Sequence, residues 1–151
     1  MINTTSSQKS LVKAALYYIR LDTYNSKALF EGTEATTLSF AQIAADELLA
    51  AAKQKEITID RWAVTPDAIH ALVGITENCL DQAYKVGKPR MLTSFVAGVK
   101  AATAKRINLV RNQPGSPVWQ RSYREQRVED ARTLARLTEK IERANSVSVS
   151  D

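Results

Sequence analysis

The chain has little cysteine, little histidine and no long apolar run. A single cysteine among 151 residues excludes an intramolecular disulfide, which fits a reducing compartment. No apolar run approaches the roughly 20 residues that a membrane-spanning helix needs. Residues 1–10 are polar and rich in Ser and Thr, without the apolar centre of a secretory signal. The sequence therefore predicts a cytoplasmic protein.

What the chain does contain is ordinary for one globular domain. Hydrophobic residues make up 44% and charged residues 25% of the sequence. A chain of this length buries roughly 70% of its unfolded surface, so it needs no metal or disulfide to fold. We predict a disordered tail at 1–10, one domain over 11–145 and a polar tail at 146–151.

Charge is distributed unevenly along the chain. The net charge is +5, yet residues 1–84 carry 7 Lys/Arg against 10 Asp/Glu, whereas residues 85–150 carry 14 against 5. A basic half joined to a mildly acidic half suggests a polyanionic partner on one surface. Solvated charges on ordinary helices would give the same composition, so charge alone leaves both interpretations open.

Hydrophobic periodicity predicts both strands and helices. The residues Thr65, Pro66 and Asp67 form a turn between two apolar runs, which together predict an antiparallel hairpin. Ser39 begins one helix, and Thr93 or Ser94 is expected to cap another. Strands are expected at 15–22, 57–64 and 68–75, and helices at 39–55, 92–112 and 128–144.

A basic stripe follows the last predicted helix. Arg132, Arg136 and Lys140 are spaced i, i+4 and i+8, and Arg143 follows, so all four lie on one side. Like charges at this spacing cost a few tenths of a kcal/mol per pair, and Glu139 offsets part of that. A negative partner would explain the stripe, and a solvated helix face is the alternative.

Further cations precede this helix and are interleaved with aromatic residues between Trp119 and Arg127. Phosphates bind cations and unpaired bases stack on rings, so this pattern is typical of a nucleic-acid surface. The candidate nucleic-acid-binding residues are Lys100, Lys105, Arg106, Arg111, Trp119, Gln120, Arg121, Arg124, Arg127, Arg132, Arg136 and Lys140.

The segment 94–145 resembles the C-terminal part of the REP-associated tyrosine transposases, which are relatives of the HUH single-tyrosine transposases. The features that carry this likeness are a basic helix ending in RIN, a Pro/Gly loop, the run PVWQRSY and a terminal helix. The stretches 17–32, YYIRLDTYNSKALFEG, and 61–75, RWAVTPDAIHALVGI, are similar to the family's first strand and its HUH-bearing hairpin. The resemblance covers nearly the whole chain, and the WQRSY stretch is its most specific part.

The resemblance implies a compact, single-domain α+β fold with an antiparallel sheet and helices packed on it. It also implies binding of hairpin-forming single-stranded DNA, and cleavage by a tyrosine that becomes linked to the 5′ phosphate. A divalent metal such as Mg²⁺ or Mn²⁺ assists that cleavage. Relatives include monomers and dimers, so the resemblance leaves a homodimer open, and the sequence does not choose between DNA and RNA.

The metal site departs from the family pattern. Two histidines spaced i, i+2 on a strand would converge on one ion, but the matching triplet here is Ala68, Ile69 and His70. His70 is the only histidine in the chain, and one imidazole binds a divalent ion weakly, even with Gln126 as an added ligand. Tyr123 matches the nucleophile, but a tyrosine hydroxyl near pKa 10 needs activation.

Three functions follow. We predict a DNA-binding protein derived from a transposase, which recognises single-stranded or hairpin DNA and whose nicking activity is weak or lost. The first alternative is an active metal-dependent nickase that uses Tyr123 as its nucleophile. The second is an interaction module that kept the fold and lost DNA. If neither residue takes part in catalysis, His70 is a histidine packed in the hairpin, and Tyr123 is a core residue or stacks on bases.

Overall fold

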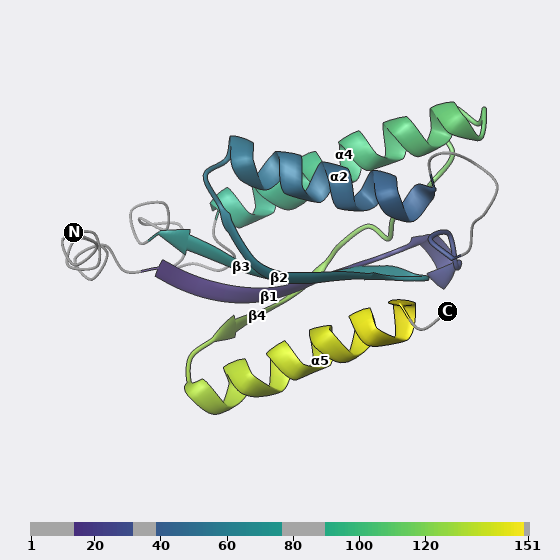
Figure 1. Cartoon of the computed structure of the whole chain (residues 1–151). Helices are drawn as coiled ribbons and strands as arrows, with labels where there is room; N and C mark the ends of the chain where they lie inside the picture. Colours follow the sequence, from purple (N-terminus) through teal and green to yellow (C-terminus); the bar gives the residue numbers. More distant parts are fainter. Residues whose placement is uncertain (1–13, 32–38, 77–89, 150–151) are drawn as a thin grey trace, which may run out of the picture.

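The computed structural model describes residues 14–31, 39–76 and 90–149, so the predicted tail at 1–10 lies outside the described residues. Four strands, three longer helices and one short 3₁₀ turn follow each other in these ranges (Figure 1). Their bounds are β1 (Ala14–Asp22), η1 (Tyr24–Ser26), α2 (Phe40–Gln54), β2 (Thr58–Thr65), β3 (Ala68–Thr76), α4 (Arg90–Val110), β4 (Arg124–Val128) and α5 (Ala131–Val149).

The four strands form one antiparallel sheet in the order β2-β3-β1-β4. The predicted hairpin is confirmed, because Thr65 pairs with Ala68 and the ladder continues from there. Helices α2 and α4 lie over one face of the sheet, and α5 lies over the other (Figure 1). The α+β fold with helices on an antiparallel sheet is therefore confirmed.

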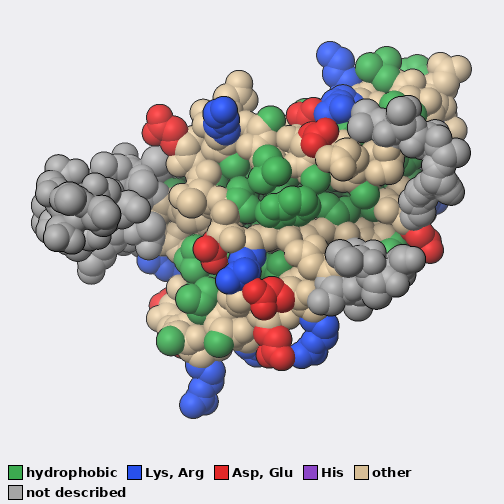
Figure 2. Space-filling view, viewed as in Figure 1, with side chains coloured by type: hydrophobic (Ala, Val, Ile, Leu, Met, Phe, Trp, Pro, Cys, Tyr) green, Lys and Arg blue, Asp and Glu red, His purple; other side chains and the backbone are tan. Residues whose placement is uncertain are grey.

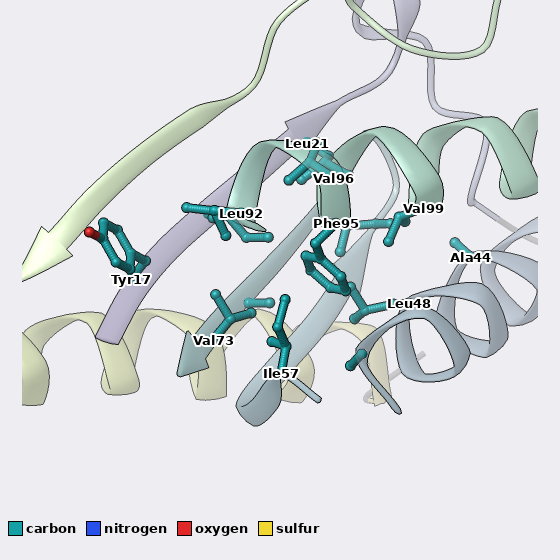
Figure 3. Close-up of a cluster of buried hydrophobic side chains, with 14 of the residues drawn as sticks. Tyr17, Leu21, Ala44, Leu48, Ile57, Val73, Leu92, Phe95, Val96 and Val99 are labelled. Atoms are coloured by element: carbon teal, nitrogen blue, oxygen red, sulfur yellow. The ribbon is translucent and has the colours of Figure 1, made fainter. Parts of the chain in front are cut away.

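Successive side chains of each strand point to opposite faces of the sheet, and this divides the hydrophobic core into two layers. Ile19 and Leu21 of β1 point to the α2–α4 face, where the ring of Phe95 and the side chain of Leu48 fill the centre of the cluster (Figure 3). Tyr18 points the other way and packs with Leu72, Ala63, Leu137 and Ile141 against α5. A residue's position in its strand therefore decides which layer it joins.

Helix α2 begins where the sequence predicts. The Ser39 side chain accepts a hydrogen bond from the Gln42 amide at 3.1 Å, which caps the helix. Helix α4 starts at Arg90, before the predicted start at Leu92, because Met91 packs against the core and adds to the apolar face of the helix. The prediction of Thr93 or Ser94 as its cap is therefore wrong, and the Ser94 hydroxyl instead accepts a hydrogen bond from Lys55 Nζ.

The predicted last helix has different bounds in the structure. Its first predicted residue, Val128, is instead the last residue of β4, a strand that pairs with β1 from Arg124 to Val128 and was not predicted. Helix α5 begins only after Asp130, whose carboxylate accepts a hydrogen bond from the Thr133 amide at 2.7 Å. The helix then continues to Val149, into the segment predicted as a tail at 146–151.

Candidate nucleic-acid interface

One flank of α5 is tied to β2. Glu142 forms an ion pair with Arg61 at 2.9 Å, and the Asn145 amide donates to the Trp62 carbonyl at 3.0 Å. Acidic and basic side chains lie next to each other on the visible side of the α5 layer (Figure 2). This flank is therefore close to electrically balanced and offers no uniform charge to a polyanion.

The opposite flank of α5 faces β1. The Lys140 ammonium lies 5.2 Å from the centre of the Tyr18 ring, and Tyr18 belongs to β1. Arg136 and Arg132 precede Lys140 by four and eight residues, so helical spacing places them on this same flank. Both are exposed, whereas Arg143 forms an ion pair with Glu139 at 2.8 Å. The predicted stripe thus runs beside the β1–β4 half of the sheet.

That half of the sheet carries its own arginines. Arg20 pairs in register with Arg124, and Tyr18 pairs with Gln126, so all four side chains share the α5 face. Arg124 is 73% exposed and contacts the Asp22 carboxylate at 3.5 Å. We name the set Arg20, Arg124, Arg132, Arg136 and Lys140 the α5–β4 surface. It brings cations from two strands and one helix to one side of the molecule.

Arg121 precedes β4 and lies near Arg20 and Arg124. The other remaining predicted cations lie in the α4 layer, on the other side of the sheet, and most of them contact other groups of the protein. Arg106 pairs with Glu47 at 2.8 Å, Arg111 Nε donates to Asn108 Oδ1 at 2.8 Å, and the Arg127 guanidinium lies 5.8 Å from the Tyr17 ring centre. Lys105 is exposed, and its side chain has no partner among the described residues. The structure thus splits the predicted set between two opposite layers.

Lys100 acts inside the fold. Its ammonium donates to the main-chain carbonyls of Gln120 at 2.7 Å and Ser122 at 3.0 Å, with the Arg121 carbonyl at 3.4 Å. An ammonium has three N–H donors, and a bent chain segment supplies matching acceptors. Lys100 therefore fixes the course of residues 120–122, which lead into β4.

We expect Lys100→Met to lower the free energy of unfolding by about 1–2 kcal/mol, because the main-chain carbonyls of residues 120–122 lose charged hydrogen bonds. The matched control is Lys105→Met, which removes the same charge from an exposed site on the same helix and should change stability by less than about 0.5 kcal/mol. Urea unfolding of both variants measures the difference. Equal stability of the two variants would show that the Lys100 contacts are energetically neutral.

Trp119 and Gln120 have different environments. The Trp119 ring packs 5.6 Å from the Phe30 ring centre against the main core, and its Nε1 is buried without a hydrogen-bond partner in the described part of the chain. This partly buried ring thus contributes to the packing of the main core. Gln120 is exposed, and its main-chain N–H donates to the Asp22 carbonyl at 2.9 Å.

His70 is buried, and both its ring nitrogens have partners. Nδ1 lies 2.8 Å from the Tyr18 hydroxyl, and Nε2 lies 3.4 Å from Thr65 Oγ1, which in turn donates to the Ala68 carbonyl. These hydrogen bonds can all form together when the neutral imidazole carries its proton on Nε2. Nε2 then donates to Thr65 Oγ1, and Nδ1 accepts from the Tyr18 hydroxyl. Burial, reinforced by the charges of Arg20 and Lys140, lowers the pKa of His70 to about 4.

Tyr123 lies on the other face of the sheet from His70. Its hydroxyl donates to Glu125 Oε1 at 3.2 Å, and Glu125 pairs with Ile19, a residue of the α2–α4 face. Burial, with Glu125 adding to it, raises the pKa of Tyr123 to about 12, so the hydroxyl stays protonated at neutral pH. The two candidate catalytic residues are therefore not brought together.

The residues of the expected metal site do not fit a divalent ion. The Nδ1 lone pair of His70 is used by Tyr18, and Ala68 supplies no donor. Gln126 shares the His70 face, but β1 separates its strand from β3. Within residues 14–31, 39–76 and 90–149, no group of three His, Cys, Asp or Glu side chains could hold a metal ion.

Sequence reasoning missed three polar residues of this face, Tyr18, Arg20 and Asp22. They alternate with apolar residues in the first strand, at i, i+2 and i+4. That spacing in a mostly apolar strand was the signal that could have identified them, because it places all three on one face.

The fold has known counterparts among solved structures. A presumed transposase from Deinococcus radiodurans R1 matches with a TM-score of 0.60 and 22% identity, over 91% of this chain and 95% of its own. A REP-associated tyrosine transposase bound to a REP hairpin matches with a TM-score of 0.61 and 14% identity, over 84% of this chain and 64% of its own. The present chain therefore shares the fold of these two proteins, as the sequence resemblance predicted.

Comparisons of sequence alone add nothing further. No protein-family model matches the chain, and no curated protein matches it. Among the helices in the described ranges, none is both long and apolar enough to cross a membrane.

Proposed function

We propose that this protein binds nucleic acid, as single-stranded or hairpin DNA, through the α5–β4 surface, and that its nicking activity is weak or lost. The observation that carries the proposal is the convergence of cations from β1, β4 and α5 on one side of the molecule. Phosphate contacts supply most of the affinity of such proteins for nucleic acid. The solved transposase with the same fold that is bound to a REP hairpin supports this choice of partner.

The second half of the proposal concerns cleavage. A tyrosine nuclease needs its hydroxyl next to the metal-polarised phosphate. Here the Tyr123 hydroxyl and His70 lie on opposite faces of the sheet, and the His70 ring is engaged by Tyr18 and Thr65. These contacts favour a binding protein over the active Mg²⁺- or Mn²⁺-dependent nickase.

The binding half is tested with a labelled DNA hairpin and a matched duplex across a salt series. We expect tighter binding to the hairpin and an affinity that falls steeply as salt rises, with a log–log slope near −0.7 to −0.9 per phosphate contacted. Absence of binding to either oligonucleotide at low salt would favour the interaction module. The mass of the protein in solution tests whether it forms the homodimer that the resemblance leaves open.

The cleavage half is tested by denaturing electrophoresis after incubation with hairpin DNA and Mg²⁺ or Mn²⁺. We expect no covalent protein–DNA adduct from the wild type. Ala68→His, which restores the missing histidine, should also form none, because the Tyr123 hydroxyl stays across the sheet. A metal-dependent adduct that disappears in Tyr123→Phe would establish the active nickase instead.

A further inference from the structure

A polar hollow of about 310 Å³ opens where β1 ends and β4 begins, at one end of the α5–β4 surface. Three arginines and one aspartate contribute to it, so its formal charge is positive. Ser26 and Ser122 add hydroxyls, and the exposed Gln120 adds an amide. The charged residues around the hollow are Arg20, Asp22, Arg121 and Arg124.

The arginines of this hollow have unused donors. Arg20 contacts Asp22 through Nε at 2.7 Å, and Arg124 contacts the same carboxylate through Nε at 3.5 Å. The terminal nitrogens of both guanidinium groups, and the whole Arg121 side chain, have no partner among the described residues. A guanidinium presents these donors as a planar fork that matches two oxygens of a phosphate.

The surrounding chain holds these groups in place. Lys100 donates hydrogen bonds to the carbonyls of residues 120–122, so Arg121 and Ser122 have a defined position. The turn that carries Ser26 is anchored by the buried Thr23, whose hydroxyl donates to the Lys27 carbonyl at 2.7 Å. Asp22 is only 17% exposed and sits between two arginines. The hollow is therefore built by the fold rather than by independent surface side chains.

We propose that this hollow binds one phosphate group of the nucleic-acid strand, with Arg20, Arg121 and Arg124 as its ligands and Asp22 as a resident competitor. The inference rests on the proposed function and specifies one subsite of that surface. The Asp22 carboxylate occupies a position between two guanidinium groups that a phosphate oxygen would also favour. Its negative charge opposes an incoming phosphate, and this sets the affinity of the subsite.

The proposal predicts opposite effects for two neighbouring substitutions. Asp22→Asn keeps the shape of the side chain and removes its charge, so hairpin DNA should bind about tenfold more tightly. Arg121→Gln should bind about tenfold more weakly, with a salt slope reduced by about one. Because the Arg121 side chain has no partner among the described residues, this variant should keep the stability of the wild type.

The experiment measures fluorescence anisotropy of a labelled DNA hairpin with a single-stranded tail, for wild type, Asp22→Asn and Arg121→Gln. Urea unfolding accompanies each variant. In parallel, inorganic phosphate is titrated against the arginine Nε–Hε NMR signals, where we expect selective shifts at Arg20, Arg121 and Arg124.

The outcomes separate the two proposals. Failure of the wild type to bind any oligonucleotide at low salt overturns the proposed function, and this subsite with it. Wild-type binding that neither substitution alters overturns the subsite alone and leaves the function standing. Weaker binding by Asp22→Asn in a fully folded variant also overturns the subsite, because Asp22 would then support the strand rather than oppose it.

Discussion

Simultaneous replacement of Arg132, Arg136 and Lys140 by glutamine is expected to weaken hairpin DNA binding by on the order of 10²- to 10³-fold at about 50 mM salt. Each of these cations neutralises one phosphate and releases one condensed counterion in this proposal. The log–log salt slope should therefore fall by about two to three. Anisotropy titrations of a labelled hairpin between low and physiological salt measure both quantities.

The control removes three cations from the opposite layer. Lys53, Arg90 and Lys105 are exposed residues of α2 and α4, and their replacement by glutamine lowers the net charge by the same amount. We expect this variant to lose less than about tenfold, because it changes only long-range attraction. An equal loss in both triple variants would mean that net charge, and not the α5–β4 surface, governs binding.

The stability of the protein is expected to fall by up to about 3 kcal/mol as pH drops from 6.5 towards 4, because of His70 alone. Burial holds the folded-state pKa at about 4, below the ordinary value of 6.5. Between these values the unfolded chain binds a proton that the folded chain excludes. The stabilising contribution is therefore present above pH 6.5 and is lost as pH falls through the folded pKa.

Urea unfolding at several pH values measures this loss, and His70→Gln should flatten the profile between pH 4 and 6.5. The charged groups that act on the ring are Arg20, Lys140, Asp22 and Asp67, and the first two lower its pKa. Since the chain has one histidine, a single imidazole NMR signal reports its titration directly. A midpoint near 6.5 in the folded protein would contradict the hydrogen-bonded, buried ring.

Much of the fold was predictable because its signals are local. The hairpin around Pro66 and the start of a helix at Ser39 each depend on a few neighbouring residues, and both are confirmed. Strand β4 was missed because its sequence, REQRV, has one apolar residue and pairs with a strand more than one hundred residues away. Pairing at that distance is a tertiary effect that local propensity does not record.

The candidate site was predictable in composition but not in arrangement. Helical spacing alone put Arg132, Arg136 and Lys140 on one flank, and the Lys140 contact with Tyr18 agrees with that. The position of Tyr123 relative to His70 depends on the faces of β4, a strand that the sequence did not reveal. Without knowledge of that strand, the sequence suggested that Tyr123 and His70 belong to one catalytic site, although they lie on opposite faces of the sheet.

The strand order also constrains how the chain folds during synthesis. Strand β1 emerges first, yet its neighbours in the sheet are β3 and β4, so one of its edges stays unpaired until residue 128 has been made. Such non-local pairing slows folding, and an open apolar edge invites aggregation. The arginine-bearing segment that closes this edge also carries part of the α5–β4 surface. A nascent or truncated chain that lacks β4 would therefore have neither a finished sheet nor a finished binding surface.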